Sequence, residues 1–175
     1  MRFLLPLLAL LAPALAHAQA CPEAYTVKQL ESDLDRFDSF AIVEDLDNAK
    51  QVAVVLTKSL PCLDTVAEPE LMTRFARDRA ILEFYRQEPD TAAKWLGMSR
   101  AAGDARWPAG YTADHPFRIL ADTVPVAEPA GVEGKGLNPP SKGAVFLNGN
   151  FLPEARAWPE APGFVQVTDK KGRVT

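Results

Sequence analysis

Glycine is scarce in one half of this chain. No glycine precedes Gly97, although the 175 residues contain ten, and most of the 15 prolines follow Arg106. A calcium-binding loop needs glycine at its sharp bend, so the acidic groups of the first half are expected to be solvated helix faces and caps. The distribution predicts a helical first half and a second half rich in turns.

Histidine and cysteine are also rare, with two of each. Zinc and copper sites favour clustered His and Cys, so we expect no metal site and no cofactor. His115 follows Asp114, but no serine of the chain lies in a G-x-S-x-G nucleophile elbow. We therefore expect His115 to cap or start a helix, and we expect no catalytic residue.

Only one long apolar run occurs, from Phe3 to Ala16, and it follows the single positive charge of Arg2. Small residues at Ala16 and Ala18 then complete the pattern of a secretory signal peptide. The run is too short to span a bilayer comfortably. We expect residues 1–18 to be a signal peptide and the protein to be exported, to the periplasm or the medium.

Basic residues form no cluster and are outnumbered. Removal of residues 1–18 leaves 18 Lys and Arg against 23 Asp and Glu. Such a balance argues against binding to nucleic acid or to an anionic membrane surface.

The two cysteines, Cys21 and Cys62, allow two interpretations. An even number of cysteines in an exported chain favours a disulfide between them. Alternatively, cleavage just before Cys21 would allow that residue to carry a lipid anchor, although Ala18 stands where lipoprotein signals usually have Leu.

Residues 19–121 show helical patterns. A capping box at Thr26 and Gln29 begins an apolar stripe with steps of three and four residues. We expect four helices, starting near Thr26, near Asp45 or Asp47, at Pro69 and at Pro89; the last should close at Gly103 with a left-handed cap. A short helix is possible from Pro116 to Leu120, and Trp107, Tyr111, Phe117 and Ile119 are expected to cover the end of the helical block.

The remaining chain divides into a linker and a β unit. Residues 122–142 are rich in Pro and Gly, and their glycines lack the spacing of a phosphate-binding loop. In residues 143–175, Asn148-Gly149 between apolar runs predicts a tight hairpin turn. Alternation of Val165 and Val167 with polar residues predicts a strand with one buried face. A unit this short is expected to pack on the helices or on a partner.

Two family resemblances follow from these motifs. The stretch from Phe75 to Pro108 resembles a tetratricopeptide (TPR) helix pair, with Ala92, Leu96 and Ser99 at the usual small, large and small positions. The turn at Asn148-Gly149 resembles that of PEGA-type β modules. The order of Leu60–Leu63, the helix of Asp90–Arg100 and Asp114–Phe117 is similar to exported bacterial TPR-like proteins of uncharacterised function.

The fold class expected is thus mainly α: antiparallel TPR-like hairpins of about four helices, a linker and a small β module. Helical hairpins form surfaces that bind other chains, so the expected function is non-catalytic binding or scaffolding in the bacterial envelope, with an envelope or secreted protein or peptide as partner. Trp107 and Trp158 are the candidate partner-binding residues. The alternatives are cell-wall or glycan attachment through the β module, or a hydrolase that uses His115.

Overall fold

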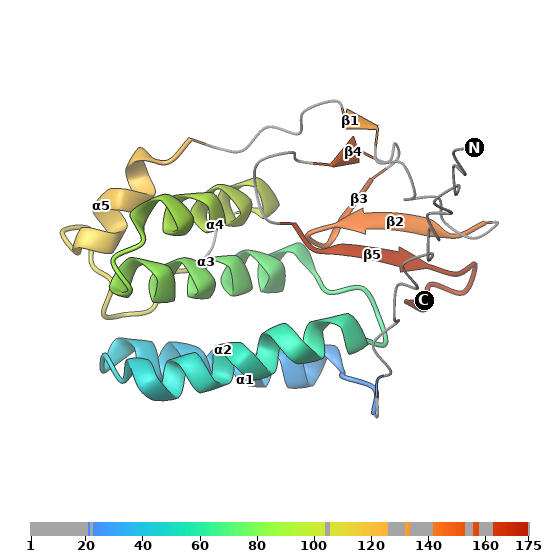
Figure 1. The fold of residues 1–175 in the computed structure, drawn as a ribbon. Helices are drawn as coiled ribbons and strands as arrows, with labels where there is room; N and C mark the ends of the chain where they lie inside the picture. The colour runs from blue at the N-terminus through green and yellow to red at the C-terminus, as the bar shows by residue number, and fades with distance from the viewer. Residues whose placement is uncertain are drawn as a thin grey trace, which may run out of the picture.

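The computed structural model describes residues 21, 23–103, 106–125, 132–133, 142–152, 156–157 and 163–174. These residues form a mainly helical protein with a small antiparallel sheet at one end and α5 at the other (Figure 1). The helices are α1 (Val27–Ile42), α2 (Leu46–Ser59), α3 (Pro69–Tyr85), α4 (Pro89–Ala102) and α5 (Pro116–Thr123), with a 3₁₀ turn, η1 (Leu60–Cys62). The strands are β1 (Val132–Glu133), β2 (Ala144–Leu147), β3 (Asn150–Phe151), β4 (Arg156–Ala157) and β5 (Val165–Thr168).

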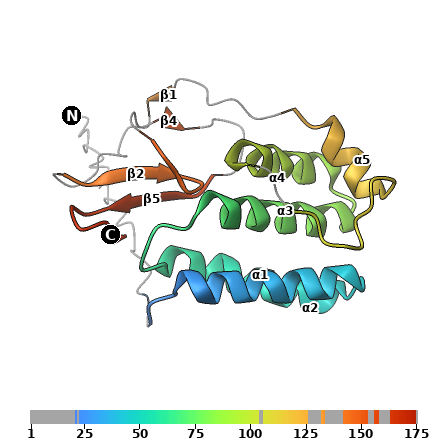
Figure 2. The ribbon, with the colours of Figure 1, turned by 180° about the vertical axis from the view of Figure 1, so that it is seen from behind.

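The first four helices form two antiparallel hairpins. The view from behind shows α1 and α2 side by side below the pair α3 and α4 (Figure 2). Helix α3 contacts α4 of its own hairpin and also α1 and α2 of the other hairpin. Each connection has three residues and the two backbone hydrogen bonds of a Schellman motif, with Glu44 and Gln87 in the left-handed conformation. Both left-handed positions are thus occupied by residues other than glycine. The left-handed residues Glu44 and Gln87 occupy equivalent positions in the two turns, and their separation along the chain is longer than the ~34-residue repeat of TPR proteins.

The local signals at the helix starts are confirmed. The side chain of Thr26 accepts a hydrogen bond from the Gln29 amide at 3.2 Å, and the Gln29 side chain accepts one from the Thr26 amide at 2.8 Å. Asp45 caps α2, and its carboxylate accepts a hydrogen bond from the Asn48 amide. The apolar stripe of α1 is buried against the rest of the helical block.

Helix α3 lies at the centre of the helical block and is buried on nearly every side. Its apolar residues Leu71, Met72, Phe75, Ala76 and Leu82 are buried, and Tyr85 is half-buried. Its charged residues Arg77, Asp78 and Glu83 are buried as well, although no sequence pattern indicates this. Ser99 of α4 faces inward, as predicted, and donates a hydrogen bond to the Thr73 carbonyl at 2.9 Å.

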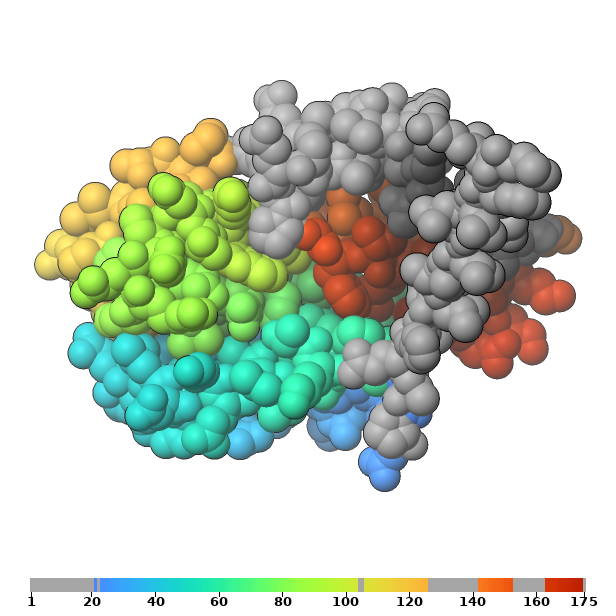
Figure 3. All heavy atoms as spheres, in the orientation of Figure 1, coloured from blue at the N-terminus to red at the C-terminus, as the bar shows by residue number. Residues whose placement is uncertain are grey.

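The three-stranded sheet has the order β3–β2–β5, and all its pairs are antiparallel. Its β2–β3 turn is the predicted Asn148-Gly149 turn, with φ of 50° and 80° at these two residues. The turn sits against the start of α3: a Cβ added to Gly149 would lie 2.5 Å from the Ala67 carbonyl oxygen. The sheet therefore packs on the helices, and Figure 3 shows its orange and red atoms against the green and teal atoms of the helical block.

Strand β5 presents the opposite face from the one expected. Gln166 and Thr168 are buried, whereas Val165 is exposed and Val167 is half-buried. The reason is a pair of hydrogen bonds to the segment before α3. The Gln166 side chain accepts one from the Ala67 amide at 3.0 Å and donates one to the Thr65 carbonyl at 3.2 Å.

Three further expectations need correction. Gly103 closes α4, but with φ of 155° and ψ of −168°, a positive-φ conformation that differs from the left-handed helical cap. Helix α5 runs to Thr123, past the expected end at Leu120. Ile119 is exposed, although Trp107, Tyr111 and Phe117 do pack together as predicted.

The expected linker, residues 122–142, contains the end of α5 and the short strand β1, which pairs with β4. Residues 1–18, which the sequence predicts to be a signal peptide, lie outside the described residues.

Candidate functional site

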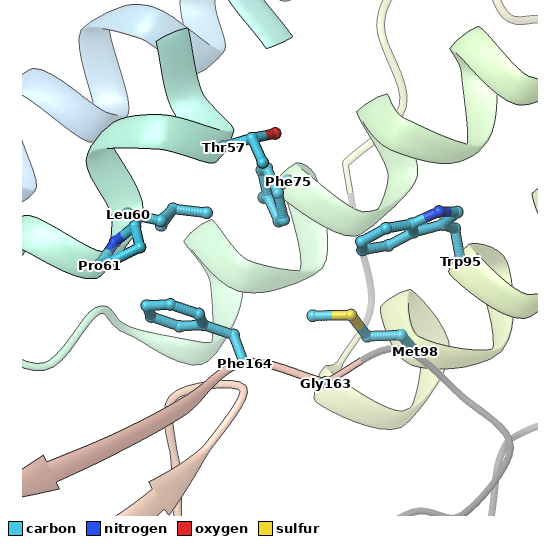
Figure 4. A pocket seen from close by; sticks show the side chains of 8 residues that line it. All are labelled: Thr57, Leu60, Pro61, Phe75, Trp95, Met98, Gly163 and Phe164. Atoms are coloured by element: carbon cyan, nitrogen blue, oxygen red, sulfur yellow. The ribbon is translucent and has the colours of Figure 1, made fainter. Parts of the chain in front are cut away.

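An apolar pocket lies where the helical block meets the sheet. Its volume is about 170 Å³. We use "apolar pocket" for the space lined by Thr57, Leu60, Pro61, Phe75, Trp95, Met98, Gly163 and Phe164. Figure 4 shows Phe75, Met98 and Phe164 pointing toward one space, with Trp95 on one side and Leu60 and Pro61 on the other. The lining thus comes from α2, η1, α3, α4 and the residues that lead into β5.

The aromatic wall of this pocket is held in place by two ring contacts. Trp95 meets Phe75 edge to face, with 5.9 Å between ring centroids. The Arg79 guanidinium lies over the Trp95 ring at 5.4 Å, a cation–π distance. The one hydroxyl of the lining, on Thr57, donates to the Ala53 carbonyl at 2.8 Å. The pocket therefore offers shape and apolar surface rather than hydrogen bonds.

A second pocket, of about 320 Å³, lies beside Trp107 and is strongly charged. We use "charged pocket" for the space lined by Glu31, Asp35 and Asp38 of α1, Glu70, Arg74 and Arg77 of α3, and the segment Arg106–Trp107–Pro108. It shares no lining residue with the apolar pocket.

The inner part of the charged pocket is an ion-pair network centred on Arg77. This guanidinium, 1% exposed, contacts Asp38 and the Arg106 carbonyl and donates to Asp78 Oδ1 from both Nε (3.0 Å) and Nη2 (2.7 Å). Arg74 Nη2 donates to Asp35 at 2.7 Å and to Asp38 at 2.9 Å. Both arginines are therefore already bound to carboxylates.

The protonation of this network depends on burial. Burial raises the pKa of Asp78 to about 8; the charge of Arg77 opposes this rise and that of Asp38 adds to it. Burial opposes the charge of Arg77, but Asp78 and Asp38 outweigh it and raise the pKa of its guanidinium. Asp78 Oδ2 has no hydrogen-bond partner among the described residues.

The two tryptophans predicted as partner-binding residues have different outcomes. Trp107 is half-buried and forms one wall of the charged pocket. The Phe117 ring packs against the Trp107 ring, with 5.6 Å between ring centroids, and the Arg118 guanidinium carbon lies 4.4 Å from the Trp107 ring centroid. Trp158 lies outside the described residues. Trp95 packs partly buried against the core and also forms a wall of the apolar pocket.

The sulfur atoms of Cys21 and Cys62 are at disulfide distance, 2.13 Å. The pair joins the start of the described chain to η1. Next to it, Tyr25 forms a parallel β-bridge with Leu63, and the Tyr25 amide donates to the Cys62 carbonyl at 2.8 Å.

His115 caps a helix, as its sequence context predicted. Its Nδ1 accepts a hydrogen bond from the Phe117 amide at 3.1 Å at the start of α5, and its ring packs on Tyr111. Asp114 accepts from the Thr112 hydroxyl at 2.6 Å instead of orienting the imidazole. The described residues contain no group of three or more His, Cys, Asp and Glu placed to hold a metal ion.

Comparisons with protein-family models, with curated proteins and with solved structures give no match for this chain. Within the described part of the chain, no helix has the length and apolar character needed to cross a membrane.

Neither pocket was foreseen as such. The sequence signals for the apolar pocket were Trp95 and Met98 on α4 and Phe164 before β5, but their convergence depends on how the sheet docks.

Proposed function

We propose that this is an exported, non-catalytic binding or scaffolding protein that holds an apolar side chain of a partner protein in the apolar pocket. The observation that carries the proposal is the pocket itself, which is lined by the helical block and by the residue pair Gly163–Phe164. The signal-peptide pattern and the cysteine pair support export.

The size and chemistry of the pocket indicate what it accepts. A closed apolar cavity of ~150 Å³ is enough for benzene, so about 170 Å³ suits one aliphatic or aromatic side chain. The Thr57 hydroxyl is already used within α2, so a polar group entering the pocket would lose its hydration without compensation. We therefore expect a Leu, Ile, Met or Phe side chain from the partner.

The test uses the position of Thr57 at the pocket edge. Thr57 is exposed, so a photocrosslinking amino acid placed there would label whatever enters the pocket in the intact envelope. The same group at Gln51, which is exposed on α2 and outside the lining, is the control. A partner captured from position 57 and not from position 51 is the expected result.

Purified partner then allows an affinity measurement by calorimetry. Thr57→Trp fills the pocket and is expected to weaken binding at least tenfold, because an excluded side chain of this size contributes about 1.5–3 kcal/mol. Gln51→Trp should bind like the wild type, and both variants should show wild-type circular dichroism. Unchanged affinity of Thr57→Trp would reject the pocket as the contact.

A further inference from the structure

The charged pocket carries an excess of negative charge. Four carboxylates line it against three guanidinium groups. The arginines of its inner part do not offset this excess for an incoming ligand, because Arg74 and Arg77 are bound to Asp35, Asp38 and Asp78.

The groups left for a ligand are the carboxylates at the pocket edge. Glu31 is exposed and makes no ion pair with any described residue. Among the described residues, Glu70 forms one ion pair, with Arg106 at 3.7 Å, and the side chains of Glu70 and Arg106 are 55% and 90% exposed. Asp35 is 66% exposed and contacts Arg74 through Oδ1. A cation entering the pocket would thus meet carboxylate oxygens with room to bind it.

The rest of the lining is apolar. Trp107 contacts the Phe117 ring edge to face and the Arg118 guanidinium lies over its ring, and Pro108 beside it is buried. Lysine and arginine combine an aliphatic stem with a charged end, and such side chains pack the stem on apolar surface while the charge stays with polar groups. The pocket volume of about 320 Å³ leaves room for one such side chain with some water.

We propose that the charged pocket binds a basic side chain, lysine or arginine, of a partner polypeptide, with the stem against Trp107 and Pro108 and the charge between Glu31, Asp35 and Glu70. The site is separate from the apolar pocket and does not depend on the function proposed for it. A partner that uses both sites would present an apolar and a basic residue on one surface.

The test follows the indole N–H signal of Trp107 by NMR in ¹⁵N-tryptophan-labelled protein, assigned with Trp107→Phe. Tetralysine is the probe, at 0.15 M salt so that attraction to distant surface charge is screened. We expect a saturable shift of the Trp107 signal with tetralysine. Tetra(acetyl-lysine), which keeps the stem and loses the charge, and tetraglutamate should give none.

Matched double variants separate the pocket from the overall acidity of the protein. Glu31→Gln with Glu70→Gln should weaken tetralysine binding about fivefold to tenfold, since exposed ion pairs are individually modest. Glu23→Gln with Asp122→Asn removes the same charge from exposed positions outside the pocket and should leave binding within twofold.

Three results would overturn the proposal: equal weakening in the two double variants, a Trp107 shift with tetraglutamate instead, or no saturable shift with tetralysine. None of them bears on the Thr57 experiment, so the two proposals can fail separately.

Discussion

Asp78 is a carboxyl group with 1% exposure that receives both of its hydrogen bonds through one oxygen, from Arg77. Its other neighbours in the electrostatic network are Asp38 on α1, Arg74 on its own helix and Tyr111 in the segment before α5. Burial disfavours the charge of Asp78, and Arg74 and Arg77 together carry two positive charges against the three carboxyl groups of Asp35, Asp38 and Asp78. The network is therefore best balanced when Asp78 keeps its proton.

Stability is expected to fall as the pH rises from 6 to 8. The folded-state pKa of Asp78, about 8, lies above its unfolded value of 3.8, so the folded protein holds a proton that the unfolded chain releases. This contribution is complete below pH 3.8 and is lost as the pH rises through about 8. The loss is about 2–3 kcal/mol between pH 6 and 8, at 1.36 kcal/mol for each pH unit.

Urea unfolding at pH 6, 7 and 8 measures this slope. Asp78→Asn keeps an oxygen acceptor for Arg77 and cannot ionise, so its stability should vary much less over the same range. An equally steep slope in Asp78→Asn would assign the pH dependence to other groups.

The helical hairpins turn through left-handed residues that are not glycine. Glu44 has φ of 56° and Gln87 has φ of 62°, and this conformation costs an L-residue about 1–2 kcal/mol relative to its usual conformations. Glu44→Gly and Gln87→Gly are therefore each expected to stabilise the protein, by up to about 1 kcal/mol after the entropy cost of glycine.

Thermal unfolding of the two variants tests this expectation. Val43→Gly is the matched control, because Val43 is exposed in the same turn but has an ordinary φ of −98°. Its substitution should destabilise the protein by a few tenths of a kcal/mol to about 1 kcal/mol. Destabilisation by all three glycines would show that the left-handed positions carry no releasable strain.

The contact between β5 and the segment before α3 depends on a single amide side chain. Gln166→Leu keeps the volume but removes the partners of the Ala67 amide and the Thr65 carbonyl. We expect a loss of about 2–4 kcal/mol in the free energy of unfolding, the cost of leaving two groups unpaired. Val165→Thr, at an exposed neighbouring position, should change the free energy by less than about 0.5 kcal/mol. Similar urea midpoints for the two variants would contradict this role.

The elements were largely predictable from sequence because their signals are local. Thr26 and Gln29 are three residues apart, and Asn148 and Gly149 are adjacent, so the capping box and the hairpin turn need no tertiary information. The face of β5 was not predictable, because Gln166 is paired with residues about a hundred positions earlier in the chain. The burial of Arg77 was missed for the same reason: its partners Asp38 and the Arg106 carbonyl come from other parts of the chain.

At the scale of the whole molecule, the Cys21–Cys62 bond closes a large loop that contains α1 and α2. Replacing both cysteines by serine should lower the free energy of unfolding by about 3–4 kcal/mol in the chain-entropy model. Wild-type protein unfolded in urea with a reductant should match the double variant, and without reductant no thiol should be alkylated. A wild-type midpoint unaffected by the reductant would show that the bond adds nothing to stability.

The contacts in this part of the molecule determine how the protein would respond to a pulling force. Three contacts bring the two ends of the described chain to the same short segment. They are the Tyr25–Leu63 bridge, the Thr168–Val174 bridge, and the hydrogen bond that the Val174 amide donates to the Asp64 carbonyl at 3.4 Å. A pulling force on Cys21 and Val174 would pass through the disulfide at one end and through the long hydrogen bond between Val174 and Asp64 at the other. The last strand would peel away first, while the disulfide would shield the α1–α2 hairpin, but not α3 and α4, from the load.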